Sequence, residues 1–226
     1  MAEPRISGLA PWSAGLPDVI GCHDGWALMG AAGAESPKDH LRRQVGWCRA
    51  AVDFLPLSPR ATPTRAEAER LVATRAPALE RAHRQVRGRL QLIVQLEICR
   101  PDPGPDLGPD LGLVRPEITG GRGWLQARAE RATREAGASA AFAAQVQRVV
   151  SALFPREGRI AALAPGGTVE TLRLRRAVLV PRAGLQAFAA ALSADLERDG
   201  RAGIWDVIAP LPPLAFASLA CDGAVT

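Results

Sequence analysis

The chain has 226 residues, of which 47% are hydrophobic and 23% are charged, a balance typical of a globular protein and unlike that of a disordered one. Its formal net charge is +5, and nearly all of the positive charge is arginine, since Lys38 is the only lysine. Arginine suits phosphates and acidic partners, but the chain is also rich in alanine, and the composition of a GC-rich genome is the favoured explanation. No signal peptide or bilayer-spanning apolar run is recognisable, so we expect a cytoplasmic protein.

The first part of the chain alternates between short strands and helices. Apolar runs bounded by proline or glycine predict strands at 5–10, 26–30 and 54–57. Ser36 before Pro37 is typical of a helix cap followed by a first helical position, and it predicts a helix over 37–52. This alternation indicates a small α+β unit.

A longer helix is predicted to begin after Thr64. Thr64 and Glu67 have the spacing of a capping box, and apolar residues recur on one face of the helix. Pro77 should kink this helix or split it in two, and Gly88 should end it. Residues 90–98 then alternate between apolar and mostly polar side chains, which makes them the clearest strand in the chain.

Residues 101–112 break this pattern. The tetrapeptide Pro-Asp-Leu-Gly occurs at 105–108 and again at 109–112, so we predict a mobile loop rich in proline, aspartate and glycine. An insertion tolerated between two elements is the favoured explanation, and a partner-binding loop is the alternative.

Helices and strands return beyond this loop. Two helical runs are predicted, one over 124–136 and a second up to 153, followed by strands at 160–163 and 170–180. A helix at 182–196 and a last strand at 204–208 come after them. Counted from the strand at 90–98, the order is strand, helix, strand, strand, helix, strand, which is that of a ferredoxin-like sheet. The predicted fold class is therefore α+β, with a small N-terminal domain over 1–87 and a ferredoxin-like C-terminal domain over 88–226.

No group of residues has the spacing of a catalytic or metal site. The four cysteines are scattered singly, and Cys22-His23-Asp24 is the only cluster that looks chemical. A metal there would need His40 or Cys48 from elsewhere in the chain, so buried free thiols are the favoured interpretation. His83 lies on a charged helix, which predicts a solvated or capping role. We therefore expect no enzyme activity, no cofactor and no metal.

Nucleic-acid binding is the main alternative that the residues themselves suggest. Ferredoxin-like sheets bind RNA when aromatic side chains stand on the central strands. Here those strands carry Leu92, Val94, Leu174 and Val178, and the chain has no tyrosine. Only an attraction between arginine and phosphate remains, so a nucleic acid is not the expected partner.

The end of the chain has its most distinctive pattern. A short apolar strand with Trp205 runs into an elbow that contains Pro210, Pro212 and Pro213, and then into Phe216. Proline fixes φ and lacks a backbone donor, so these residues do not fit a helix or a central strand. The segment is predicted to be a rigid extended turn that closes a sheet.

Five blocks, in the same order along the chain, resemble the gas vesicle protein F/L (GvpF/GvpL) family. They are the strand at 54–57 with the helix after it, the strand from Gly88, the helix start at 123–128, the strand at 176–182 and the elbow at 210–216. The chain departs from the family where tyrosine is frequent, because Ser7, Val178 and Leu214 stand there, and it has the Pro-Asp-Leu-Gly repeat in addition.

This resemblance implies an accessory protein of gas vesicle formation, without enzyme activity, found in the cytoplasm and as a minor component of the vesicle. Its partners would be the hydrophobic shell subunit, whose aggregation it would limit during nucleation, and other vesicle accessory proteins, with no membrane involved. We place the expected interface at Trp205, Leu211, Pro213 and Phe216, or else these residues fill the core behind the last strand. The alternative function is a ferredoxin-like ligand- or RNA-binding module unrelated to gas vesicles.

Overall fold

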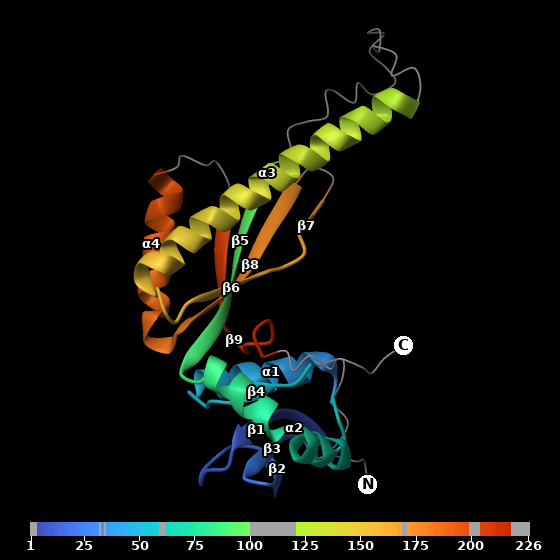
Figure 1. The fold of residues 1–226 in the computed structure, drawn as a ribbon, viewed down its shortest axis with the longest axis vertical. Helices are drawn as coiled ribbons and strands as arrows, with labels where there is room; N and C mark the ends of the chain where they lie inside the picture. The colour runs from blue at the N-terminus through green and yellow to red at the C-terminus, as the bar shows by residue number, and fades with distance from the viewer. Residues whose placement is uncertain are drawn as a thin grey trace.

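The computed structural model describes residues 4–31, 33, 35–58, 62–99, 121–168, 171–198 and 204–217. Within these ranges the chain forms two antiparallel sheets with helices packed on them, one sheet from each half of the sequence (Figure 1). The predicted α+β class is therefore confirmed. The repeat at 101–112 lies outside the described residues.

The N-terminal sheet has the strand order β2-β3-β1-β4. Its strands are β1 (Arg5–Pro11), β2 (Val19–His23), β3 (Trp26–Ala31) and β4 (Leu55–Pro56). The sequence predicted β1, β3 and the edge strand β4, but it missed β2. The signal for β2 is the Asp24-Gly25 turn, in which both residues have positive φ, 46° and 79°. Asp-Gly in this conformation is typical of a tight hairpin, and it joins β2 to β3.

Helices α1 (Pro37–Arg49) and α2 (Arg65–Val86) cover the two faces of this sheet. As predicted, the Ser36 side chain caps α1 by accepting from the Asp39 amide, and Thr64 and Glu67 form the capping box of α2. α2 runs through Pro77 as one helix. Gly8 allows α1 to pack closely, because a Cβ atom at that position would lie 3.0 Å from the ring of Trp47 in α1.

The C-terminal sheet has the order β6-β8-β5-β9, with β7 paired to β8. Its elements are β5 (Arg89–Cys99), α3 (Gly121–Leu153), β6 (Arg159–Ala162), β7 (Gly166–Gly167), β8 (Thr171–Pro181), the 3-10 turn η1 (Arg182–Gly184), α4 (Leu185–Arg198) and β9 (Ile204–Leu211). The two long strands β5 and β8 are central and every neighbouring pair is antiparallel. This is the predicted ferredoxin-like arrangement.

The sequence predicted two helical runs where the structure has the single helix α3. The first run was predicted to end at Ala136, before Gly137. However, a glycine inside a helix costs only about 1 kcal/mol relative to alanine. The surrounding alanine, glutamate and arginine residues favour a helix on both sides of it. Figure 1 shows that the first turns of α3 extend beyond the sheet.

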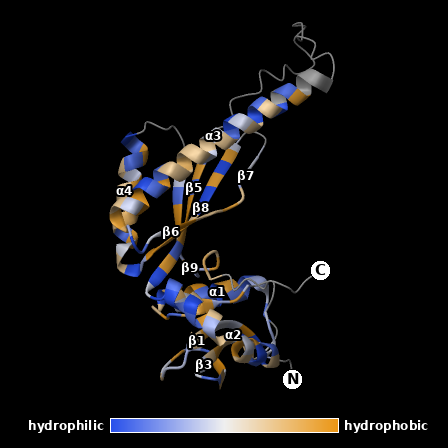
Figure 2. Ribbon diagram, in the orientation of Figure 1, coloured by the Kyte–Doolittle hydropathy of each residue, from blue (hydrophilic) through white to orange (hydrophobic). Residues whose placement is uncertain are grey.

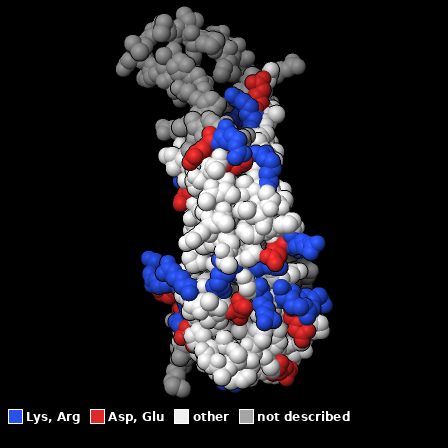
Figure 3. Space-filling model, turned by 90° about the vertical axis from the view of Figure 1, so that its left-hand side faces the viewer, with Lys and Arg blue, Asp and Glu red and all other residues white. Residues whose placement is uncertain are grey.

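α3 and α4 pack on one face of the C-terminal sheet, and the core lies between them (Figure 2). Its fully buried side chains include Leu92, Val94, Phe142, Val178, Phe188 and Leu192. On the side of the molecule over α4, the middle of the surface is largely uncharged, and Lys, Arg, Asp and Glu gather in a band over the N-terminal half (Figure 3).

The two halves meet around Asp53. Its carboxylate accepts a hydrogen bond from the Gly88 amide at 3.0 Å and lies 3.6 Å from Arg182, whose guanidinium also donates to the Cys48 carbonyl. The end of the chain also returns to the first half, because Phe216 and Ala217 pack in the core between α2 and the N-terminal sheet. Residues from both ends of the sequence therefore share one core, while the boundary between 87 and 88 stays a prediction.

Candidate functional site

Strand β9 forms one edge of the C-terminal sheet. It pairs with β5, from Leu211 opposite Gln91 to Ile204 opposite Glu97, and within the described ranges no strand pairs with its other side. β9 has eight residues, whereas the other edge strands have four in β6, five in β2 and two in β4. An open edge of this length presents a row of backbone N–H and C=O groups to which another strand can bind.

Successive side chains of β9 point to opposite faces of the sheet. Trp205, Val207 and Ala209 pack against the core under α3 and α4. Ile204 and Ile208 stand on the other face, which we call the outer face, with 79% and 39% of their surfaces exposed. The open edge therefore carries exposed apolar side chains beside its free backbone groups.

The neighbouring residues of β5 and β8 extend this surface. Ile93 lies directly opposite Ile208, and Glu97 lies opposite Ile204. The Glu97 carboxylate accepts from Arg173 at 2.9 and 2.6 Å. This pair is neutral as a unit, and Asp206 of β9 and Arg175 of β8 both lie opposite Gln95, so the face carries charges of both signs beside the exposed isoleucines.

The four residues predicted as the interface lie in different surroundings. Trp205 packs on the C-terminal core and Phe216 on the N-terminal core. Pro213 is buried, and Leu211 is half-buried at the end of β9. The structure does not bring the four together as one surface, and their role in binding stays a prediction.

The exposed isoleucines were missed at the level of sequence. Their spacing does place Ile204, Asp206 and Ile208 on one face of a strand. Both faces of this strand are mostly apolar, however, so the period of two does not tell which face is covered. Only the position of α3 and α4 decides it.

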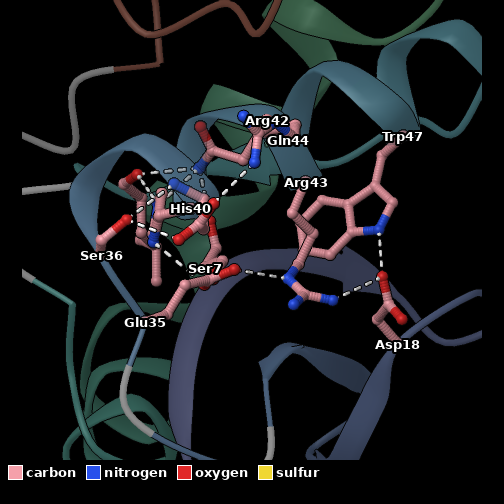
Figure 4. A network of polar contacts seen from close by, with 11 residues as sticks. Ser7, Asp18, Glu35, Ser36, His40, Arg42, Arg43, Gln44 and Trp47 are labelled. Atoms are coloured by element: carbon pink, nitrogen blue, oxygen red, sulfur yellow. Dashed lines mark hydrogen bonds and ion pairs between the residues drawn. The ribbon is translucent and has the colours of Figure 1, made fainter.

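A second set of polar residues, at α1, forms a partly buried network (Figure 4). The Glu35 carboxylate accepts from Arg43 Nε at 2.9 Å and from Ser7 Oγ at 3.3 Å. Asp18 accepts from the indole of Trp47 at 2.8 Å and lies 3.2 Å from Arg43. These contacts tie α1 to β1 and to the loop before β2.

His40 and Gln44 continue this network into the core, where both are fully buried. The Gln44 amide donates to the carbonyls of Ser7 at 2.6 Å and Leu57 at 2.9 Å. Burial lowers the pKa of His40, although the Leu57 carbonyl and Glu35 oppose this effect. A histidine so enclosed is held neutral, and since water and substrates do not reach it, we interpret the network as structural.

The remaining candidates for chemistry do not converge. His83 is buried and stacks edge-on against Trp26, with ring centroids 5.9 Å apart, so the predicted solvated role is wrong. Cys22 is exposed, whereas burial raises the pKa of the Cys48 thiol to about 11. In the part of the chain that the structure describes, no three His, Cys, Asp or Glu residues gather as a metal site.

None of the helices in the described ranges is both long enough and apolar enough to cross a membrane.

No family model matches the chain, and no curated protein matches it in sequence. Two solved structures are nevertheless similar over almost its whole length. The crystal structure of the gas vesicle protein GvpF from Anabaena sp. PCC7120 covers 97% of this chain and 98% of its own, with a TM-score of 0.70 and 11% identity. The crystal structure of the gas vesicle protein GvpF from Microcystis aeruginosa covers 97% and 100%, with a TM-score of 0.64 and 15% identity.

At these identities the similarity concerns the fold. This chain has the fold of the two GvpF proteins, and the resemblance inferred from the five sequence blocks is confirmed at that level.

Proposed function

We propose that this chain is an accessory protein of gas vesicle assembly, which binds the hydrophobic shell subunit and limits its aggregation during nucleation. A fold shared with two gas vesicle proteins along 97% of the chain supports the assignment to gas vesicles. The observation that supports binding is the open edge of β9 with Ile204 and Ile208 beside it.

The physical argument starts from the partner. A shell subunit with a large apolar face aggregates unless that face is covered. An open strand edge covers an extended segment by adding it to the sheet, so that backbone hydrogen bonds provide affinity and alternate side chains provide selectivity. On β9 the added strand would place apolar side chains against Ile204 and Ile208.

The RNA-binding alternative is supported less well. No aromatic side chain is among the outer-face residues of β5 and β8, and Arg173 is already paired with Glu97. Stacking of bases, one of the two requirements of a single-strand nucleic-acid surface, has no aromatic platform among these residues, although Arg175 also lies on this face.

The test is co-expression of the full chain with a tagged shell subunit, followed by capture at low and high salt. We expect wild-type capture to survive high salt, because the interface is apolar. Ile204→Lys together with Ile208→Lys should lower capture about tenfold, since two charges would be buried in the contact. The melting temperature should change by less than about 3 °C, because surface changes have small effects on stability.

The matched control is Leu125→Lys, which changes a residue near the start of helix α3 that is 59% exposed and lies outside the sheet. It should capture the subunit as well as wild type does. Equal capture by the double variant and the control would contradict a role of β9. Capture by wild type that disappears at high salt would instead support the phosphate- or RNA-binding alternative.

A further inference from the structure

The regular part of the β9 edge is its first five residues. Residues 204–208 pair one to one with residues 93–97 of β5, whereas the register shifts by one residue before Leu211 reaches Gln91. Pro210 lies in this irregular stretch and has no backbone N–H to offer. Helix α1 also contacts β9, and the Leu211 end of β9 lies beside the start of β5, where the two halves meet. The edge that remains for an added strand is therefore 204–208, about 17 Å long.

Asp206 lies at the centre of this edge. It stands on the outer face between Ile204 and Ile208, and all three side chains are exposed. Its neighbour across the sheet is the uncharged Gln95 of β5. The cation in this row, Arg175 of β8, lies on the far side of Gln95, two strands away, and no described residue forms an ion pair with Asp206. The edge therefore presents a carboxylate without a partner between two apolar side chains.

We infer that Asp206 selects the segment that adds to β9, and that this segment carries lysine or arginine between two apolar residues at alternate positions. Residues directly opposite each other in paired strands have Cβ atoms about 5 Å apart, so the central residue of the segment meets the Asp206 carboxylate. A cation there forms an ion pair, and an acidic residue is repelled. An apolar residue removes water from the carboxylate without replacing it.

The pattern of the bound segment is symmetric about its centre. When its two apolar residues rest on Ile204 and Ile208, its cation lies beside Asp206 in either direction of the added strand. The selection by charge therefore does not depend on whether the segment runs parallel or antiparallel to β9.

A second copy of this chain fits the edge less well. Two β9 strands that pair antiparallel with Ile204 opposite Ile208 place the two Asp206 carboxylates opposite each other, and like charges in such a pair are destabilising. The same carboxylate repels a polyanion. The occupant that the charge favours is an extended protein segment with a basic centre.

This inference rests on the proposed function, because it requires that a strand adds to β9. It deepens that function by giving the sequence pattern of the bound segment. Strand addition without any selection by charge would leave the proposed function standing and remove only the inference.

The test uses the full chain and two fluorescent β-hairpin peptides, closed by an Asn-Gly turn so that little order has to form on binding. One strand of each hairpin reads Val-Thr-Lys-Thr-Val or Val-Thr-Glu-Thr-Val, and the other strand is threonine throughout. Binding is measured by fluorescence anisotropy at low and high salt. We expect the lysine hairpin to bind about fivefold more tightly at low salt. This preference should shrink at high salt, which screens an exposed ion pair, while binding through the apolar residues remains.

The net charge of the chain acts against this expectation. At +5, the chain as a whole attracts the glutamate hairpin more than the lysine hairpin. A preference for lysine therefore reports a local carboxylate rather than the overall field.

Variants of the chain locate the preference. Asp206→Asn should bind both hairpins about equally, and Asp206→Lys should bind the glutamate hairpin more tightly. Because this side chain is exposed, both variants should keep the melting temperature within about 3 °C of wild type. The matched control is Glu130→Lys, which makes the same change of charge at an exposed position of α3 outside the sheet and should keep the preference for lysine.

Several results would overturn the inference. Equal binding of the two hairpins by wild type, lost in Ile204→Lys with Ile208→Lys, would show strand addition without selection. A preference for lysine that persists in Asp206→Lys would exclude this carboxylate as its source. Binding of neither hairpin would contradict strand addition itself and, with it, the binding mode of the proposed function. A wild-type dimer in sedimentation that dissociates in the double isoleucine variant would make a second copy the occupant.

Discussion

The two sheets of this protein are buried in different ways. The N-terminal sheet lies between α1 and α2, so both faces are covered, and polar groups of Ser7, His40 and Gln44 are enclosed with it. α3 and α4 cover one face of the C-terminal sheet, over a mostly apolar core in which Gln145 and Arg176 are also buried. The side that is left open carries the β9 edge.

This difference separates two sources of stability. The N-terminal half combines apolar packing with a polar network in which the Gln44 amide donates to two carbonyls, and the loss of such a donor to a buried acceptor is costly. The C-terminal half depends on the volume of its apolar side chains. Ile204 and Ile208 at the edge of the second sheet stay exposed, although Gln91, Ala177 and Leu179 on the same face are buried.

The largest effect should come from the C-terminal core. Phe142 of α3 is fully buried against the sheet, so Phe142→Ala should lower the free energy of unfolding by about 3–5 kcal/mol, from lost burial and the cavity left behind. Urea unfolding followed by circular dichroism measures this. Phe142→Leu is the control and should cost much less. A cost of the alanine variant below about 1 kcal/mol would contradict the importance of packing here.

Phe216 tests whether the halves are as separate as this comparison suggests. It lies after the last strand of the C-terminal sheet but packs on the N-terminal core. Phe216→Ala should therefore lower stability by about 2 kcal/mol, less than Phe142→Ala because Phe216 is half-buried. The measurement is urea unfolding followed by tryptophan fluorescence.

Lower capture of the shell subunit by Phe216→Ala, with an unchanged melting temperature, would contradict the placement of Phe216 in the core. It would identify the residue as part of the binding surface rather than of the core.

Gln44 tests the polar part of the comparison. Gln44→Leu keeps most of the volume but leaves the Ser7 and Leu57 carbonyls without the amide that now donates to them. We expect a loss of about 1–3 kcal/mol in the free energy of unfolding. Gln147→Leu, an exposed position on α3, is the control and should stay within about 0.5 kcal/mol of wild type. Equal stability of the two variants would show that the network contributes little.

The smallest effect should be the dependence on pH. Burial lowers the pKa of both His40 and His83 below the usual 6.5. The unfolded chain therefore binds protons near pH 6.5 while the folded chain does not, so stability is full above this pH and decreases as the pH falls below it. Unfolding measured at pH 7.5, 6.5 and 5.5 should show the decrease. His40→Gln together with His83→Gln should show a weaker dependence, and an unchanged slope would contradict the assignment.

Local signals in the sequence were sufficient for most elements. The caps at Ser36 and Thr64, the alternation at 90–98 and the order of helices and strands predicted both sheets and the ferredoxin-like arrangement. Errors arose at two places, in the helix after the loop and in the first hairpin. The predicted helical run ended at Ala136 although α3 continues to Leu153, and the Asp24-Gly25 turn was not recognised as a hairpin.

The candidate site could be predicted only in part. The closing segment was recognised as distinctive, and its strand is the open edge of the sheet. The exposure of Ile204 and the burial of Pro213, however, depend on which face the helices cover and on where the chain end returns. His83 was misplaced for the same reason, since its helix presents this one residue to Trp26.

The sequence by itself determined the elements, their caps and their order, because these depend on neighbours within a few residues along the chain. Only the tertiary structure decided which faces are covered, and that no described strand pairs with the outer edge of β9. Those outcomes depend on contacts between residues far apart in the sequence, such as Phe216 with the core of the first sheet. The surface proposed for binding is a part of the fold that these distant contacts leave uncovered.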